Sequence, residues 1–146
     1  MKQLKSSVQW TDLVSMKMKE LHKDGFTREQ VEETLRIMPF HPAMIRGLKS
    51  LKERNPHVEL VILSNSNEVY IDVILKHHKI DNLFSSVITN KAHWSNDGCL
   101  MLSRRVDPNG PQHNCKIGCS PNMCKGEFSF LKKIKYIQLI ILQVRN

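Results

Sequence analysis

The sequence predicts an α/β domain in which parallel strands are flanked by helices, with a small hairpin added. Three observations support this class. Residues 58–63 form an almost continuous apolar run, as is typical of a strand buried on both faces of a parallel sheet. Segments with a helical spacing of apolar residues lie before and after this run. The resulting order of helix, strand, helix and strand indicates helices layered on a sheet.

Three helices are expected within about residues 9–54. Residues 9–24 have apolar side chains at helical spacing and are followed by a glycine, which favours a helix stop. A capping box at residues 27–30 begins the second helix, and Pro42 suits the first turn of the third. The side chains expected to face the core are Trp10, Leu13, Val14, Met18 and Leu21 in the first helix, Val31, Leu35 and Met38 in the second, and Met44, Ile45, Leu48 and Leu51 in the third.

The predicted core of the domain, residues 58–89, consists of a strand, a helix and a second strand. After the apolar run, residues 64–67 are expected to form a loop. Residues 68–78 then return to a helix whose wide apolar face indicates substantial burial. A short strand is expected at residues 86–89.

Residues 91–124 are predicted to contain a hairpin and then a cysteine-rich loop. The hairpin is predicted from Asn96-Asp97-Gly98, a strong turn signal between two partly apolar segments. The tail, residues 128–146, differs in character, because it begins like a helix and ends like a strand. Two alternatives remain open for the tail: it packs on the sheet as a surrogate strand, or it is exposed and prone to aggregate.

The composition is that of an ordinary globular domain. The 146 residues suffice for one domain, and 40% of them are hydrophobic and 25% charged. The net charge of +8 is spread along the chain, which disfavours nucleic acid as a partner. The apolar run at residues 136–144 is far shorter than the ~20 residues of a membrane-spanning helix. Polar residues follow Met1, and four cysteines suggest free thiols or a metal site, so an intracellular, cytoplasmic protein is expected.

Ser64 is the first candidate for chemistry, because it follows the apolar strand and precedes a helix. Ligands of open α/β sheets bind at the carboxyl ends of strands, where helix N-terminal amides can hold an anion. A hydroxyl there suits a phosphoryl oxygen, although a role in turn formation or helix capping would explain the same serine. Lys125, just before a predicted helix start, could bring an ammonium group to the same phosphate.

A second candidate set is formed by a histidine and three cysteines in one loop: His113, Cys115, Cys119 and Cys124. Such residues can hold zinc tetrahedrally, although their spacing matches no standard zinc knuckle or ribbon. Free or buried thiols are the alternative interpretation. A small zinc- or nucleic-acid-binding module is therefore the alternative function for this chain.

Three segments taken together resemble a known family: Met38-Pro-Phe-His-Pro-Ala-Met44, Leu60-Val-Ile-Leu-Ser-Asn-Ser-Asn67, and the stretch from His113-Asn-Cys to Pro-Asn-Met-Cys-Lys-Gly126. They are similar to phosphatases of the haloacid dehalogenase (HAD) superfamily, in the group that includes phosphoethanolamine/phosphocholine phosphatase and pyridoxal phosphate phosphatase. The resemblance covers about residues 10–127. It implies an incomplete Rossmann-like domain with a small cap over residues 1–127.

The resemblance also implies roles for individual residues. Ser64 matches the family's second motif and Lys125 its third, so both are expected to hold the phosphoryl group of a small phosphomonoester. Asn65 is the candidate on the substrate side, where several relatives carry an aspartate. In the intact family, Mg²⁺ is the cofactor.

The departures from the family are as informative as the matches. The sequence has no Asp-x-Asp and no Gly-Asp-Gly-x-Asn-Asp, so the nucleophile, the general acid/base and the magnesium ligands are missing. Asp12 lies in a helix that the family places after its first motif. Covalent phosphoryl transfer needs the missing carboxylate. The chain is therefore expected to be a fragment that is inactive alone, and marginally stable or prone to aggregate.

Overall fold

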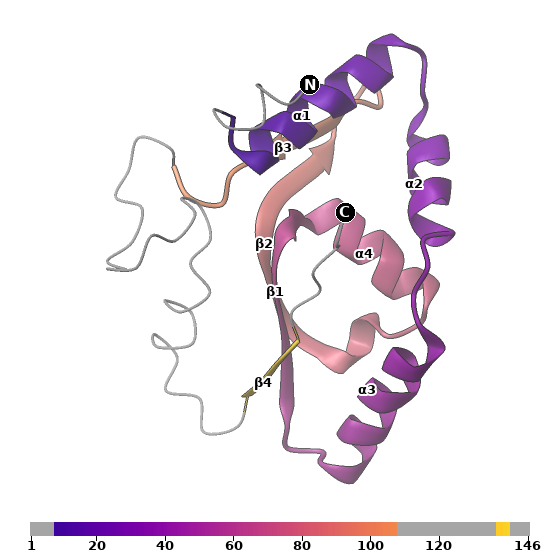
Figure 1. Ribbon diagram of the computed structural model, residues 1–146, viewed down its shortest axis with the longest axis vertical. Helices are drawn as coiled ribbons and strands as arrows, with labels where there is room; N and C mark the ends of the chain where they lie inside the picture. Colours follow the sequence, from indigo (N-terminus) through magenta and orange to yellow (C-terminus); the bar gives the residue numbers. More distant parts are fainter. Residues whose placement is uncertain (1–7, 108–136, 141–146) are drawn as a thin grey trace.

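The structure is a computed structural model that describes residues 8–107 and 137–140 (Figure 1). Its helices and strands follow one another in the predicted α/β order. Their bounds are α1 Trp10–Lys23, α2 Arg28–Arg36, α3 Pro42–Arg54, β1 Glu59–Asn67, α4 Glu68–His77, the short 3₁₀ helix η2 Asp81–Leu83, β2 Phe84–Trp94, β3 Leu100–Ser103 and β4 Ile137–Ile140. Among the described residues, every helix is too short or too polar to cross a membrane.

The four strands form one mixed sheet in the order β3-β2-β1-β4. β1 pairs in parallel with β2 on one side and with β4 on the other. β3 is antiparallel to the last residues of β2, which confirms the predicted hairpin. Figure 1 shows α2, α3 and α4 on one side of β1 and α1 lying over the hairpin. The α/β class with parallel strands and flanking helices is confirmed.

The helix boundaries follow local signals in the sequence. Thr27 accepts a hydrogen bond from the Gln30 amide, and the Gln30 side chain accepts one from the Thr27 amide, so the predicted capping box is present. Pro42 occupies the first turn of α3, where its missing N–H leaves no hydrogen bond unmade. Gly25 follows α1 with a φ of 87°, a conformation that glycine adopts without steric strain.

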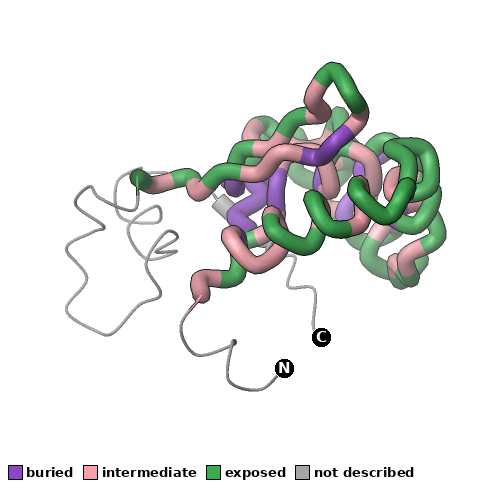
Figure 2. Tube along the Cα trace, turned by 90° about the horizontal axis from the view of Figure 1, so that it is seen from above, coloured by how far each residue is buried: buried purple, intermediate pink, exposed green. Residues whose placement is uncertain are grey.

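The core lies between the sheet and the helices, as the buried segments in Figure 2 show. β1 has four consecutive buried apolar residues, and the two that point toward α4, Leu60 and Ile62, are fully buried. They pack with Leu48 of α3 and with Ile71 and Leu75 of α4. At ~25 cal/mol per Å² of buried apolar surface, such contacts are the main stabilising contribution to the fold.

Two side chains expected in the core are exposed. Met44 is 41% exposed, because the part of α3 that meets the core is centred on Leu48. Trp10 is 48% exposed, whereas its neighbour Thr11 is buried. The face of α1 that packs on the rest of the protein carries Thr11, Ser15, Met18 and His22. The other predicted positions on α1, Leu13, Val14, Met18 and Leu21, are half-buried, so only Trp10 departs from the prediction.

The second strand is longer than the sequence predicted. Instead of ending at residue 89, β2 continues without a break to Trp94, so that its first part pairs with β1 and its last part with β3. The hairpin turn is formed where Gly98 donates to the Ser95 carbonyl at 2.9 Å, and Gly98 adopts a φ of 86°. The last described segment, β4, pairs with β1, which agrees with the surrogate-strand alternative for the tail.

Candidate functional site

Ser64 lies near the carboxyl end of β1 and is only 2% exposed. The pairing of β1 with β2 is regular up to Leu63, opposite Ile88, and resumes at Asn67, opposite Asn90. β1 therefore carries two more residues than β2 over this stretch, which makes Ser64–Ser66 a bulge. Residues 64–67 were predicted as a loop, but they belong to the strand. β1 pairs with β2 again at Asn67, so the strand continues beyond the bulge that contains the two extra residues.

The hydroxyl of Ser64 is part of the bulge itself. Its Oγ accepts a hydrogen bond from the Ser66 N–H at 3.1 Å. Asn67, at the end of the bulge, accepts from the Tyr70 N–H at 3.0 Å and thereby caps the N-terminus of α4. The positive end of the α4 dipole therefore lies immediately after the bulge, where it favours an anion.

Asn90, on the neighbouring strand β2, forms hydrogen bonds to the bulge. It is fully buried, and its Nδ2 donates to the carbonyl oxygens of Asn65 and Ser66, both at 2.8 Å. Its Oδ1 accepts from the Arg105 N–H at 3.1 Å. One side chain thus connects β1, β2 and the segment after β3. Asn90 was not predicted from the sequence, although a polar residue directly after the apolar end of the neighbouring strand was a signal for it.

Two side chains bring charge and polarity to the outer side of the bulge. Asn65 is exposed. Glu68, in the first turn of α4, forms an ion pair with Lys91 at 2.5 Å, and one of its oxygens accepts from the Ala92 N–H at 3.4 Å. Lys91 therefore offsets part of the negative charge beside the helix N-terminus.

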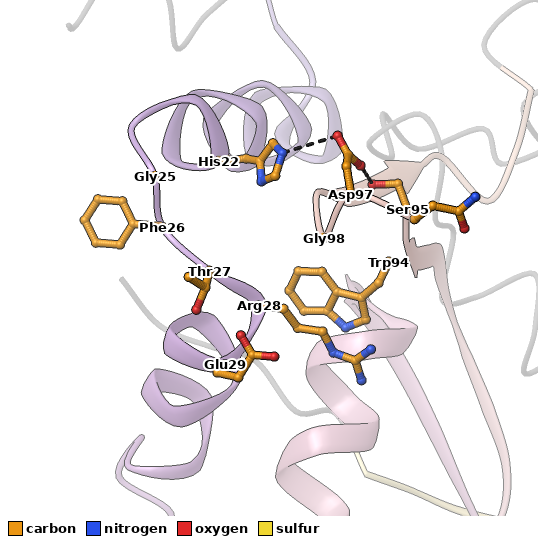
Figure 3. Close-up of a pocket in the computed structure, with 11 residues that line it drawn as sticks. His22, Gly25, Phe26, Thr27, Arg28, Glu29, Trp94, Ser95, Asp97 and Gly98 are labelled. Carbon is orange, nitrogen blue, oxygen red and sulfur yellow. Dashed lines mark hydrogen bonds and ion pairs between the residues drawn. The ribbon is translucent and has the colours of Figure 1, made fainter.

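A separate open cavity of about 440 Å³ lies between the corner that joins α1 to α2 and the hairpin turn (Figure 3). His22 Nε2 is 3.3 Å from Asp97 Oδ2, and the Arg28 guanidinium lies 5.4 Å from the centroid of the Trp94 ring. A hydrogen bond from the Ser95 hydroxyl, with smaller contributions from other neighbours, holds the pKa of Asp97 below its usual value. These charged groups are balanced within the cavity wall. The Ser64 bulge, with its helix N-terminus, is therefore the better candidate for an anion site.

Asp12 has a structural role in the described part of the chain. Its carboxylate receives two hydrogen bonds from the Arg104 guanidinium, one of them at 2.9 Å, which join α1 to the end of the hairpin. The hydrogen bonding from Arg104 lowers the pKa of Asp12. In the same region, burial raises the pKa of Tyr70, whose hydroxyl lies 3.1 Å from the sulfur of Met18.

The structure places Ser64 and Asn65 side by side in the bulge. Lys125 lies outside the described residues, and so does the His113, Cys115, Cys119 and Cys124 set. Within residues 8–107 and 137–140, no group of three or more His, Cys, Asp or Glu residues could hold a metal ion.

Comparisons with known proteins relate this chain to phosphatases. A family model described as Putative Phosphatase matches residues 1–139. Inorganic pyrophosphatase 1 of Arabidopsis thaliana is 37% identical over 125 residues, which cover 85% of this chain and 42% of that protein. No solved structure matches the chain.

Two further relatives are phosphatases by name. The thiamine phosphate phosphatase-like protein of Arabidopsis thaliana is 31% identical over 85% of this chain and 49% of its own length. Pyridoxal phosphate phosphatase PHOSPHO2 of Bos taurus is 28% identical over 80% of this chain and 46% of its own length. The chain therefore spans less than half the length of these three relatives.

Proposed function

This chain belongs to the Putative Phosphatase family of HAD-type phosphatases, and from that premise we propose that it forms the phosphate-holding half of a phosphatase for small phosphomonoesters. The observation that carries the proposal is the position of Ser64. A hydroxyl in a bulge at the carboxyl end of a buried parallel strand, directly before a capped helix N-terminus, suits a phosphoryl group.

In this proposal the residues of the chain bind and orient the phosphoryl group. Ser64 and the positive end of α4 hold its oxygens, and Lys125 supplies a full positive charge. Phosphoryl transfer depends on such positioning and charge stabilisation. The chain has no Asp-x-Asp to supply a nucleophilic carboxylate. By itself it should therefore bind phosphate compounds without turning them over.

Asn65 gives a further expectation about the substrate class. It is exposed beside Ser64, and its amide both donates and accepts hydrogen bonds without carrying charge. A carboxylate at this position would attract a substrate amine. We therefore expect phosphate esters with neutral polar groups, such as the pyridoxine phosphate type, to bind more tightly than phosphocholine or phosphoethanolamine. Asn65→Asp should shift this preference toward phosphoethanolamine.

The test is calorimetric titration of the chain with inorganic phosphate, pyridoxine phosphate, phosphocholine and pyrophosphate. Pyridoxine phosphate is chosen because it lacks the aldehyde of pyridoxal phosphate, which reacts with lysines. Ser64→Ala and Lys125→Ala should each weaken phosphomonoester binding about tenfold, because a hydrogen bond to a charged group contributes ~1.5–3 kcal/mol. Pyrophosphate is included because some relatives are named as inorganic pyrophosphatases.

The matched controls are Ser103→Ala and Lys19→Ala, which change exposed residues at the end of β3 and on α1. Both should leave binding unchanged. If the controls weaken binding as much as Ser64→Ala and Lys125→Ala do, the affinity comes from general positive charge and the proposal is wrong. Clearly tighter binding of pyrophosphate than of any monoester would replace the proposed substrate class with phosphoanhydrides.

A further inference from the structure

The orientation of the peptide groups in the bulge is set by a side chain outside it. The carbonyl oxygens of Asn65 and Ser66 both point to Asn90 Nδ2, at 2.8 Å. The described peptide bonds are all trans. In a trans peptide the N–H points opposite to the C=O, so the amides of Ser66 and Asn67 are directed away from Asn90. The Ser66 amide indeed meets the Ser64 hydroxyl, at 3.1 Å.

This arrangement matters for an anion at Ser64. A peptide carries a dipole whose negative end is the carbonyl oxygen and whose positive end is the N–H. With both carbonyls held on the Asn90 side, the Ser66 N–H points toward the Ser64 hydroxyl, shortly before the capped N-terminus of α4 with its positive dipole end. A carbonyl turned to that side would repel a phosphoryl oxygen instead.

Asn90 is suited to this role by its own surroundings. It is fully buried, and it donates to two carbonyls while it accepts from the Arg105 amide at 3.1 Å. A buried amide with partners on both its donor and acceptor atoms is fixed in orientation, since any rotation would leave polar groups unsatisfied.

We propose that Asn90 is a positioning residue for phosphate binding: it holds the carbonyls of Asn65 and Ser66 away from the anion that binds at Ser64. The proposal rests on the phosphate-binding function above and adds the residue that shapes the binding face. Asn90 acts through the bulge and does not touch the phosphate itself.

The experiment compares Asn90→Leu with Asn82→Leu in the full chain, with inorganic phosphate as the probe. Leucine has nearly the shape of asparagine but no hydrogen-bond donor, so the bulge carbonyls lose their partner. Asn82 is an exposed asparagine in η2 and serves as the matched control. Phosphate is titrated while the amide resonances of Ser66 and Asn67 are followed by NMR, and thermal unfolding is measured without phosphate.

The expected result is at least a tenfold loss of phosphate affinity for folded Asn90→Leu, together with loss of the phosphate-induced shifts at Ser66 and Asn67. Asn82→Leu should behave like the wild-type chain. A merely structural role would lower the unfolding temperature and leave the affinity of the folded protein and these amide shifts unchanged. Asn90→Leu that binds phosphate like the wild type would therefore overturn the proposal while the phosphate-binding function stands.

Two further outcomes are decisive. If Asn90→Leu does not fold, Asn90→Ser is measured in its place. Its hydroxyl can donate only one hydrogen, so its affinity should fall by about threefold or more, and unchanged affinity would again contradict the proposal. If the wild-type chain itself does not bind phosphate, the proposed function and the role of Asn90 are both wrong.

Discussion

At the bulge of β1, polar contacts are made by neutral groups that are buried, whereas the junction between α1 and the hairpin is joined by charged groups near solvent. Ser64, Asn67 and Asn90 are each at most 2% exposed. The ion pair between Asp12 and Arg104 has side chains that are 41% and 20% exposed. The same protein thus uses two kinds of polar interaction in two places.

The difference has a physical consequence. A buried group that loses its hydrogen-bond partner destabilises a protein by ~1–3 kcal/mol, whereas an exposed ion pair contributes ~0–1 kcal/mol and is screened by salt. The bulge should therefore keep one geometry across pH and ionic strength. The junction should respond to both. A site that must hold an anion in one orientation is better built from buried neutral groups than from exposed ion pairs.

The largest expected effect comes from the apolar core beneath the bulge. Ile62→Ala should lower the free energy of unfolding by about 2–5 kcal/mol, because Ile62 is fully buried in β1 and its truncation leaves a cavity. Met44→Ala is the control, since Met44 is 41% exposed on α3, and it should have a much smaller effect. Urea unfolding followed by circular dichroism measures both. Equal losses for the two variants would contradict the observed burial.

A smaller effect is expected from the cap that links the bulge to α4. Asn67→Ala removes the acceptor for the Tyr70 N–H and should destabilise the protein by about 0.5–2 kcal/mol. Asn82→Ala, at an exposed position of η2, should change stability by less than about 0.5 kcal/mol. Thermal unfolding of both variants, repeated at high salt, tests the comparison. A loss at Asn67 that disappears in salt would show that this region, too, depends on exposed charge.

Much of the fold was predictable because its signals are local. The capping box at Thr27 and the proline at position 42 fixed the starts of α2 and α3, and the apolar run before Ser64 identified the central strand. Ser64 was predicted as a site residue from its position after that strand and from the family resemblance, and Asn65 from the resemblance; both roles stay predictions. These features depend on neighbours within a few residues along the chain.

The features that were missed depend on contacts between distant segments. The bulge exists only in the register of β1 against β2, and Asn90 acquires its role because it meets carbonyls more than twenty residues away in sequence. Trp10 was placed in the core from periodicity, but it is 48% exposed while its neighbour Thr11 is buried, and Ser15 of the same helix donates to the Leu102 carbonyl of β3. Periodicity in one helix cannot report such contacts.

The smallest effect is expected at the junction, and it should depend on pH. Asp12→Asn removes the charge that pairs with Arg104 and should destabilise the protein by ~0.2–1 kcal/mol at neutral pH, a small value because Asp12 is partly exposed. In the folded protein, the hydrogen bonding from Arg104 lowers the pKa of Asp12 below its usual value of 3.8. When folding lowers the pKa of a carboxyl group, its ionised form stabilises the folded protein. This stabilisation is complete at pH values above the pKa of the unfolded state, and it is lost as the pH falls through the pKa of the folded state.

The difference in stability between wild type and Asp12→Asn should therefore be constant from neutral pH down to about pH 4–5 and should close below that range. Urea unfolding at a series of pH values measures it, with Asp24→Asn, at the exposed end of α1, as the matched control. Because screening acts on exposed pairs, added salt should also narrow the difference. A difference that persists at pH 2, or that is unaffected by salt, would mean that Asp12 stabilises the junction by packing and not by charge.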